Sequence, residues 1–157
     1  ILEPCGMAQT RVDDHFEVIA NRARGYFRDE GGRLRNSPLC DTSNRIPGGG
    51  LCGTVVDLAR FAAALQSGQL LREGTAQAML TRQKTRGGRR SGYGLGWIVS
   101  ARKELEAWCT GAQPQVSACL FIRPRQQVSV IILCNLESIP NQLTELARRV
   151  ADLATAL

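Results

Sequence analysis

The sequence predicts an α+β domain in which an antiparallel sheet packs with helices. Helical periodicity dominates the middle of the chain and its C-terminal end, whereas strand-like runs dominate from Tyr93 to Asn135. Segregated helices and strands are typical of the α+β class, and strands joined by short turns pair antiparallel. We expect a helical and loop region over residues 1–92, and a sheet with a terminal helix of the same domain over residues 93–157.

The first 50 residues show little regular periodicity. Val12 to Ile19 is expected to form a short helix. The polar run Asp29-Glu30-Gly31-Gly32 separates Tyr26–Arg28 from Arg33–Arg35, which predicts a hairpin with a glycine turn. An irregular loop then leads to Gly48-Gly49-Gly50, which is expected to be a turn before a helix rather than a phosphate cradle, since no Lys-Ser/Thr pair follows.

Two helices are predicted after this loop. Thr54 is the expected N-cap of the first, with Asp57 in its first turn, and Ser67-Gly68 ends it. Gly74 begins a second, shorter helix that reaches Leu80 and is expected to pack into the core. The apolar face of the first helix consists of Val55, Leu58, Phe61, Ala62 and Leu65.

The remaining segment predicts four antiparallel strands and one helix. The strands are Tyr93–Ser100, Glu104–Thr110, Ser117–Ile122 and Val128–Asn135. The run from Val128 to Leu133 is apolar on both faces, so we expect it to be a central, covered strand. Pro140 begins the last helix, whose apolar stripe needs a sheet to pack on. That stripe is Leu143, Leu146, Val150, Leu153 and Leu157.

Charge and hydropathy exclude several functional classes. The net charge is +6, yet the arginines are scattered and few aromatic residues lie among them for base stacking, so nucleic-acid binding is not expected. No apolar run approaches the ~20 residues that a membrane span needs. The start Ile1-Leu2-Glu3-Pro4 lacks the features of a signal peptide, and an initial Ile instead of Met predicts a piece of a longer chain.

The six cysteines are unevenly spaced and include no C-x-x-C pair. His15 is the only histidine, so no zinc site is expected, nor any other metal or cofactor. His15 itself is expected to be a surface loop residue rather than a general base. Free cysteines favour a reducing compartment such as the cytoplasm.

An ordered set of motifs resembles the serine β-lactamase and penicillin-binding-protein family, close to its mitochondrial β-lactamase-like branch. The resemblance runs through almost the whole chain. Its motifs are Glu3–Thr10, Asn21–Tyr26, Asp41–Leu51, Thr54 with Asp57-Leu58, Tyr93-Gly94-Leu95-Gly96-Trp97, and Trp108–Ile122. It implies a β-lactamase/transpeptidase-like fold that lacks its N-terminal part, and a parent protein that hydrolyses amides, lactams or esters through an acyl-serine.

The resemblance also implies the site residues. The family's active-site strand corresponds to Cys109, Thr110, Gly111 and Ala112, with the Ala112 backbone N–H as an oxyanion donor and Trp108, Gln113 and Ser117 as substrate-binding positions. Cys109 stands where the family has a basic residue or histidine, and an ordinary thiol is mostly neutral at pH 7. Gln115 stands where the family commonly has Gly and is expected to obstruct the turn. The implied nucleophile of the S-x-x-K motif would lie upstream of Ile1.

Ser100-Ala101-Arg102-Lys103 also matches S-x-x-K, but it falls in a turn between two expected strands. Catalysis requires Ser and Lys one helical turn apart, so this match is not expected to be catalytic.

Two hypotheses remain. The chain is the C-terminal part of a serine hydrolase and inactive alone, or it belongs to a penicillin-binding-like pseudoenzyme that binds a peptide or cell-wall fragment. Either would take a small-molecule or peptide ligand. Without N-terminal strands, Val128–Asn135 or its neighbour would present an unpaired edge, so we expect the chain to associate with itself or with the missing half.

Overall fold

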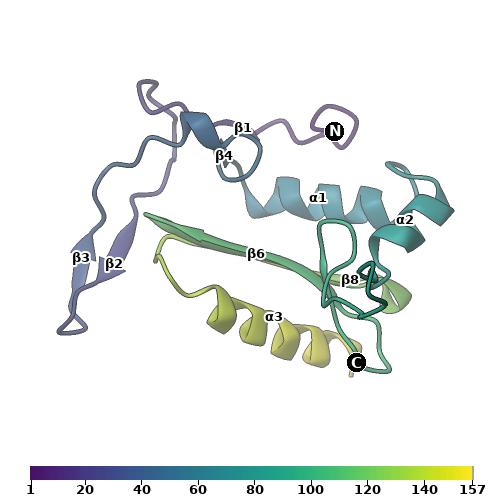
Figure 1. Cartoon of the computed structure of the whole chain (residues 1–157). Coiled ribbons are helices and arrows are strands. Elements are labelled where there is room, and N and C mark those ends of the chain that lie inside the picture. Colours follow the sequence, from purple (N-terminus) through teal and green to yellow (C-terminus); the bar gives the residue numbers. More distant parts are fainter. Residues whose placement is uncertain (157) are drawn as a thin grey trace.

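The structure is a computed structural model that describes residues 1–156. Its centre is a four-stranded antiparallel sheet with helix α1 (Val55–Gln66) on one face and helix α3 (Pro140–Thr155) on the other (Figure 1). The strands follow in the order β5 (Ile98–Val99), β6 (Ala107–Gln113), β7 (Val116–Arg123) and β8 (Val128–Cys134). This arrangement confirms the α+β class and the antiparallel sheet.

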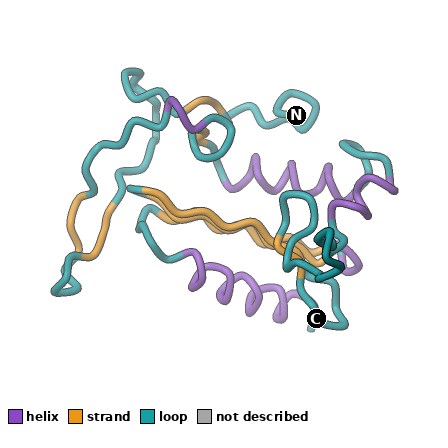
Figure 2. Tube along the Cα trace, viewed as in Figure 1, coloured by secondary structure: helices purple, strands orange, loops and turns teal. Residues whose placement is uncertain are grey.

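Short elements surround this sheet. Helix α2 (Glu73–Met79) follows α1, and the 3₁₀ turn η2 (Pro124–Gln126) joins β7 to β8. The N-terminal segment is mostly loop and extends away from the sheet (Figure 2). It contains two antiparallel strand pairs and one 3₁₀ turn. These are β1 (Arg11–Val12) with β4 (Leu51–Cys52), β2 (Tyr26–Arg28) with β3 (Leu34–Asn36), and η1 (Ser43–Arg45). The predicted hairpin is therefore confirmed.

The short helix expected over residues 12–19 is wrong. Only the first of these residues is in a regular element, the strand β1. The Asp14 carboxylate accepts a hydrogen bond from the Phe16 N–H, and Asp13 binds the Arg22 guanidinium. Such side-chain bonds compete with the backbone bonds of a helix. Phe16 and Val18 are exposed, so no apolar face is buried here to offset the loss.

Helix α1 begins and ends as its sequence predicts. The Thr54 hydroxyl accepts a hydrogen bond from the Asp57 N–H at 3.2 Å, and Gly68 takes a φ of +78° just past the helix end. Asp57 also has a role that the sequence did not reveal. Its carboxylate is buried and accepts hydrogen bonds from the Gln9 N–H and the Thr10 hydroxyl, which attaches the N-terminal segment to α1.

A hydrophobic core lies on each face of the sheet, and alternating side chains of β7 contribute to both cores. Ile122 packs towards α1, whereas Phe121 and Cys119 pack towards α3. The core on the α1 side contains Ala62, Leu65, Trp97, Val99, Ala107 and Ile122. The core on the α3 side contains Cys119, Phe121, Leu143, Ala147 and Ala151. The sheet is thus covered on both faces.

Two strand predictions need correction. The first strand is limited to Ile98–Val99, because the preceding residues turn back on themselves, with the Gly94 N–H donating to the Trp97 carbonyl. Strand β8 is not central. It lies at the edge of the sheet and pairs only with β7 among the described strands. Its two apolar faces arise because α1 and α3 cover it from both sides.

The apolar stripe of α3 is also only partly correct. Leu143 faces the sheet as expected, together with Ala147 and Ala151. Leu146, Val150 and Leu153 are exposed, Leu153 to 71 %. The apolar arc of this helix is therefore wider than the face that the sheet covers. Leu157, the last residue of the predicted stripe, lies outside the described residues.

A buried ion network joins α3 to the sheet. The Glu106 carboxylate accepts hydrogen bonds from Arg123 at 2.8 Å and from Arg148 at 3.0 Å, and Arg123 also binds Asp152 at 2.6 Å. Burial raises the pKa of the Glu106 carboxyl, but the two arginines outweigh it and hold this pKa below its ordinary value. Glu106 is therefore a charged group in the interior.

Over residues 1–156, no helix is both long and apolar enough to cross a membrane. All six cysteines are free thiols.

Candidate active site

The strand that carries the predicted site, β6, has an open edge. β5 pairs only with Ala107 and Trp108, so residues 109–113 have β7 on one side and no described strand on the other. The Glu106 carbonyl accepts from the Ser100 N–H on the β5 side. Because hydrogen-bonding direction alternates along a strand, the backbone groups of Thr110 and Ala112 also point to this open edge. The Ala112 N–H is thus oriented away from β7.

The β6–β7 hairpin is closed by the two residues Pro114 and Gln115. Gln115 takes a φ of +81°, a region that favours glycine. Its N–H donates to the Glu137 carboxylate and its side-chain amide donates to the Pro38 carbonyl. The turn therefore forms with Gln115 in place, and the expected obstruction is not observed.

Cys109 lies on the face of β6 that is directed towards α1. Its thiol donates to the Gly96 carbonyl at 3.1 Å, and it packs against the core on the α1 side. Burial raises the pKa of this thiol to about 11. Cys109 is therefore neutral at pH 7 and can neither act as a thiolate nor supply positive charge.

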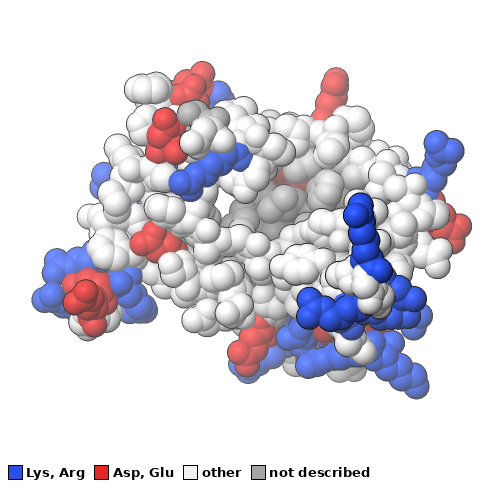
Figure 3. Space-filling view, viewed as in Figure 1, with Lys and Arg blue, Asp and Glu red and all other residues white. Residues whose placement is uncertain are grey.

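Thr110, Gly111 and Ala112 follow Cys109 towards the exposed end of the strand. Gly111 and Ala112 are exposed and Thr110 is half-buried. On this side the molecule is hollowed at its centre, between α1 and the sheet (Figure 3). The alternation of side chains along β6 puts Cys109 and Gly111 on the α1 face and Thr110 on the opposite face.

Trp108 does not share a face with Cys109. Its ring stacks on Phe121 with centroids 6.3 Å apart, and the Arg148 guanidinium lies 5.5 Å from its centroid. These contacts belong to the layer between the sheet and α3. Trp108 is thus separated by the strand itself from Cys109 and Gly111.

Ser117 and Gln113 are occupied by contacts within the chain. Ser117 is fully buried, and its hydroxyl accepts from the Ile139 N–H just before α3, so it is not accessible to a substrate. The Gln113 amide donates to the Gly49 carbonyl at 2.8 Å and accepts from Arg45. The Ser117 side chain therefore packs inside this chain, and Gln113 holds the loop of η1 against the end of β6.

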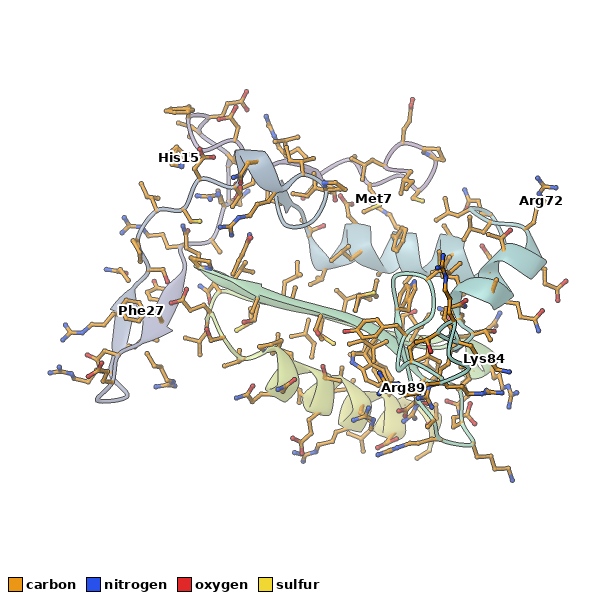
Figure 4. All side chains as sticks on the ribbon, in the orientation of Figure 1. Met7, His15, Phe27, Arg72, Lys84 and Arg89 are labelled. Atoms are coloured by element: carbon orange, nitrogen blue, oxygen red, sulfur yellow. The ribbon has the colours of Figure 1, made fainter. Side chains whose placement is uncertain are left out.

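The other catalytic-looking residues do not form a site. The Ser100 hydroxyl donates to the Glu104 carbonyl and accepts from the Glu106 N–H, within a turn rather than a helix. Lys103 is exposed in the same turn. His15 lies in an exposed loop and contacts Phe16 (Figure 4). Among the residues that the structure describes, no group of His, Cys, Asp and Glu could hold a metal ion.

Sequence reasoning missed the partners of the site strand. Gly96 accepts from Cys109, while Gly49 and Arg45 fix Gln113. A side chain at Gly49 would approach the Gln113 amide oxygen to 2.8 Å, so this glycine allows the close contact. Both glycines belong to motifs of the family resemblance, but their spacing alone carries no signal of these contacts.

Comparison with known proteins agrees with this architecture. The human mitochondrial serine beta-lactamase-like protein LACTB is 26 % identical over 179 aligned positions, which cover 88 % of this chain and 33 % of LACTB. Human putative beta-lactamase-like 1 is 39 % identical over 83 positions, which cover 51 % of this chain and 16 % of that protein. The chain thus spans about a third or less of these relatives.

Solved structures show the same fold. A penicillin-binding protein from Bacillus halodurans superposes with a TM-score of 0.72 at 19 % identity, covering 96 % of this chain and 46 % of that one. A D-amino acid amidase from Ochrobactrum anthropi gives a TM-score of 0.75 at 19 % identity, covering 99 % and 49 %. The chain therefore corresponds to about half of a β-lactamase/transpeptidase-like fold.

A family model described as Beta-lactamase matches residues 1–155, which is nearly the whole chain. This match agrees with the half-fold seen in the superpositions. The chain belongs to the beta-lactamase family.

Proposed function

We propose that this chain supplies the oxyanion strand and one wall of the substrate cleft of an acyl-serine hydrolase that acts on amides, lactams or esters. The observation that carries the proposal is the open edge of β6, where the Ala112 N–H is directed away from β7. A backbone N–H needs no particular side chain, so Ala in place of Gly retains the donor. Such a donor stabilises the negative charge that develops on the carbonyl oxygen in the transition state.

The serine nucleophile would come from a segment outside these 157 residues, and the chain would be inactive alone. The similar structures include an amidase, a class C beta-lactamase and a penicillin-binding protein, and the chain spans only about half of each. Within the chain, the one S-x-x-K match is a turn whose hydroxyl is engaged with backbone groups. Both facts support a nucleophile supplied from elsewhere.

A second candidate is a pseudoenzyme that binds a peptide or cell-wall fragment without hydrolysing it. The observation that favours it is the neutral Cys109, which stands where the family has a proton-handling group. Its thiol is engaged in a hydrogen bond to the Gly96 carbonyl. Gln113, held between Gly49 and Arg45, further restricts that end of the strand. A site with these changes retains shape but lacks a charge for proton transfer.

The two candidates differ in covalent labelling. We would treat the longest natural protein that contains this sequence, and the 157-residue chain, with a fluorescent penicillin and a fluorophosphonate probe, and locate the label by mass spectrometry. If the parent is a hydrolase, the probes should modify a serine outside the 157 residues and no residue within them. Reversible binding without label supports the pseudoenzyme. Label within the chain that Ser100→Ala abolishes would contradict both.

We further propose that the missing half of the fold, or a second copy of the chain, covers the open edge of β8 and the exposed side of α3. The exposed side consists of Leu146, Val150 and Leu153. An unpaired strand edge beside apolar side chains favours association. Sedimentation of the chain alone should therefore show a coefficient that rises with concentration.

A matched pair of variants tests this surface. Leu146→Glu with Leu153→Glu should weaken association, whereas Leu34→Glu, an exposed position in the β2–β3 hairpin, should not. A monomer at all concentrations would contradict the proposal.

A further inference from the structure

A second depression lies at the other end of the sheet from the hairpin that closes the candidate site. It is a cleft of about 560 Å³ between the C-terminal end of α1, α2, the end of β5 and η2. This volume is typical of small-molecule sites. The lining side chains come from different elements, so the cleft exists only in the folded chain.

Positive charge surrounds this cleft. Five cationic side chains line it, and Glu73 is the only carboxylate among its lining residues. None of the five cations forms an ion pair within the described residues. Figure 3 shows lysine and arginine side chains gathered over this end of the molecule, where Figure 4 labels Lys84 and Arg89 of the adjoining loop. The five lining cations are Arg82, Arg90, Arg102, Lys103 and Arg125.

The floor of the cleft differs from its rim. Leu80 and Leu105 contribute half-buried apolar side chains to the lining, above the buried Leu65 and Ile122. Gln66 also lines it, and the Gln66 side-chain oxygen is buried with no hydrogen-bond partner in the described chain. Arg82 is held in place, because its Nε donates to the Ser91 carbonyl at 2.7 Å, and its terminal nitrogens form no ion pair within the described residues. The Gln66 amide oxygen is an acceptor, so a water molecule or a ligand hydroxyl would complete it, and an anionic head group would not.

We propose that this cleft binds a small amphiphilic anion, an apolar body that ends in a phosphate or carboxylate group. The arginine rim would hold the anionic head through charge-assisted hydrogen bonds, and Leu80 and Leu105 would contact the tail. The cleft volume favours a small molecule over a protein segment. The proposal is independent of the hydrolase reaction and of the residues on β6.

The test is calorimetric titration of the longest natural protein that contains this sequence with decyl phosphate and decanoate, both below their micelle-forming concentrations. Pyrophosphate and decanol serve as probes that have only the anion or only the tail. Decyl phosphate or decanoate should bind at least tenfold more tightly than pyrophosphate and decanol, and its binding should weaken as salt is added. The relative affinity of decyl phosphate and decanoate identifies the preferred head group.

Two double variants distinguish binding in the cleft from attraction to the net positive charge of the protein. Arg82→Gln with Arg125→Gln should weaken binding at least tenfold, whereas Arg24→Gln with Arg28→Gln removes the same charge elsewhere and should leave it unchanged. Ala76→Leu, which fills part of the cleft from α2, should weaken binding of the tailed anions but not of pyrophosphate. Ala76 lies on helix α2, and Leu is also a good helix former, so the Ala76→Leu variant should still fold.

Three outcomes would overturn the proposal. The first is an absence of binding by both tailed anions. The second is an equal loss of affinity in the control variant, which would indicate attraction to net charge alone. The third is tighter binding of a poly-glutamate peptide than of decyl phosphate, which would assign the cleft to an acidic protein segment.

Discussion

Replacing Glu106 with Gln should strongly destabilise the chain. Glu106 is 2 % exposed and is the shared acceptor of Arg123 and Arg148. Gln keeps the shape of the side chain but removes its charge. Among the described residues, the Arg123 guanidinium would then remain buried with Asp152 as its only carboxylate partner, and the Asp152 side chain is 61 % exposed.

The expected cost follows from the burial of these groups. Removing one partner of a buried ion pair typically costs 3–5 kcal/mol, because the other charge stays in the interior without compensation. The remaining contact with Asp152 places the expected value at the lower end, at about 3 kcal/mol. With a urea dependence of about 2 kcal/mol per molar, the unfolding midpoint should fall by about 1.5 M.

The assay is urea unfolding followed by tryptophan fluorescence at a fixed protein concentration, from pH 8 to pH 3. The pKa of the Glu106 carboxyl is lowered from its ordinary value of 4.5, so its contribution to stability is complete above that pH. It is lost as the pH falls through the lower, folded-state pKa. The difference between the native chain and Glu106→Gln should thus be constant from pH 8 to about 5.5 and narrow below 4.5.

Controls make this prediction refutable. Glu145→Gln removes a carboxylate from the exposed side of α3 and should change the free energy of unfolding by less than about 0.5 kcal/mol. Replacing Glu106 with Leu and Arg123 with Met together should cost less than Glu106→Gln, because the buried Arg123 charge is removed with its partner, whereas Arg148 loses Glu106 in both variants. A cost below about 0.5 kcal/mol for Glu106→Gln, or a difference that persists unchanged to pH 3, would refute the reasoning.

Three further predictions concern other parts of the chain. Phe121→Ala removes a fully buried ring between the sheet and α3 and should cost about 3–5 kcal/mol in the same urea assay, whereas a cost below 1 kcal/mol would mean that this core is not packed as described. Thr54→Ala should cost about 1 kcal/mol through loss of the α1 N-cap, with Thr54→Ser nearly neutral as its control. Because burial raises the pKa of Cys109 to about 11, its alkylation by iodoacetamide should be slow at pH 7.5 and should accelerate about tenfold per pH unit up to pH 10; fast labelling at neutral pH, measured by mass spectrometry, would contradict this.

Local signals in the sequence predicted most of the regular structure. The N-cap Thr54, the helix-starting Pro140 and the glycine turn of the β2–β3 hairpin each act within a few residues of the element that they define. The apolar runs likewise predicted strands β6, β7 and β8 in antiparallel order. Residues 12–19 are the exception, because hydrogen bonds of Asp13 and Asp14 replace those of the expected helix.

The candidate site was predictable only in part. The motif around Cys109 identified the strand, but it could not indicate which face of the sheet each side chain would occupy. Trp108 packs towards α3, and Ser117 is buried under the start of that helix. The positions of these two side chains depend on contacts with residues of α3 and its preceding turn, more than 20 positions away. Such contacts produce no pattern in the sequence near the motif.

What the sequence by itself determined is the class of fold, the order of its elements and the family, because capping, periodicity and turn chemistry are local and survive in short motifs. What only the tertiary structure decided is which surfaces are left uncovered. The open edge of β6, the exposed side of α3 and the cationic cleft beyond α2 each arise where separate elements meet or fail to meet. Burial is a property of the packed chain, so these surfaces are defined by the assembly of the elements and not by any one of them.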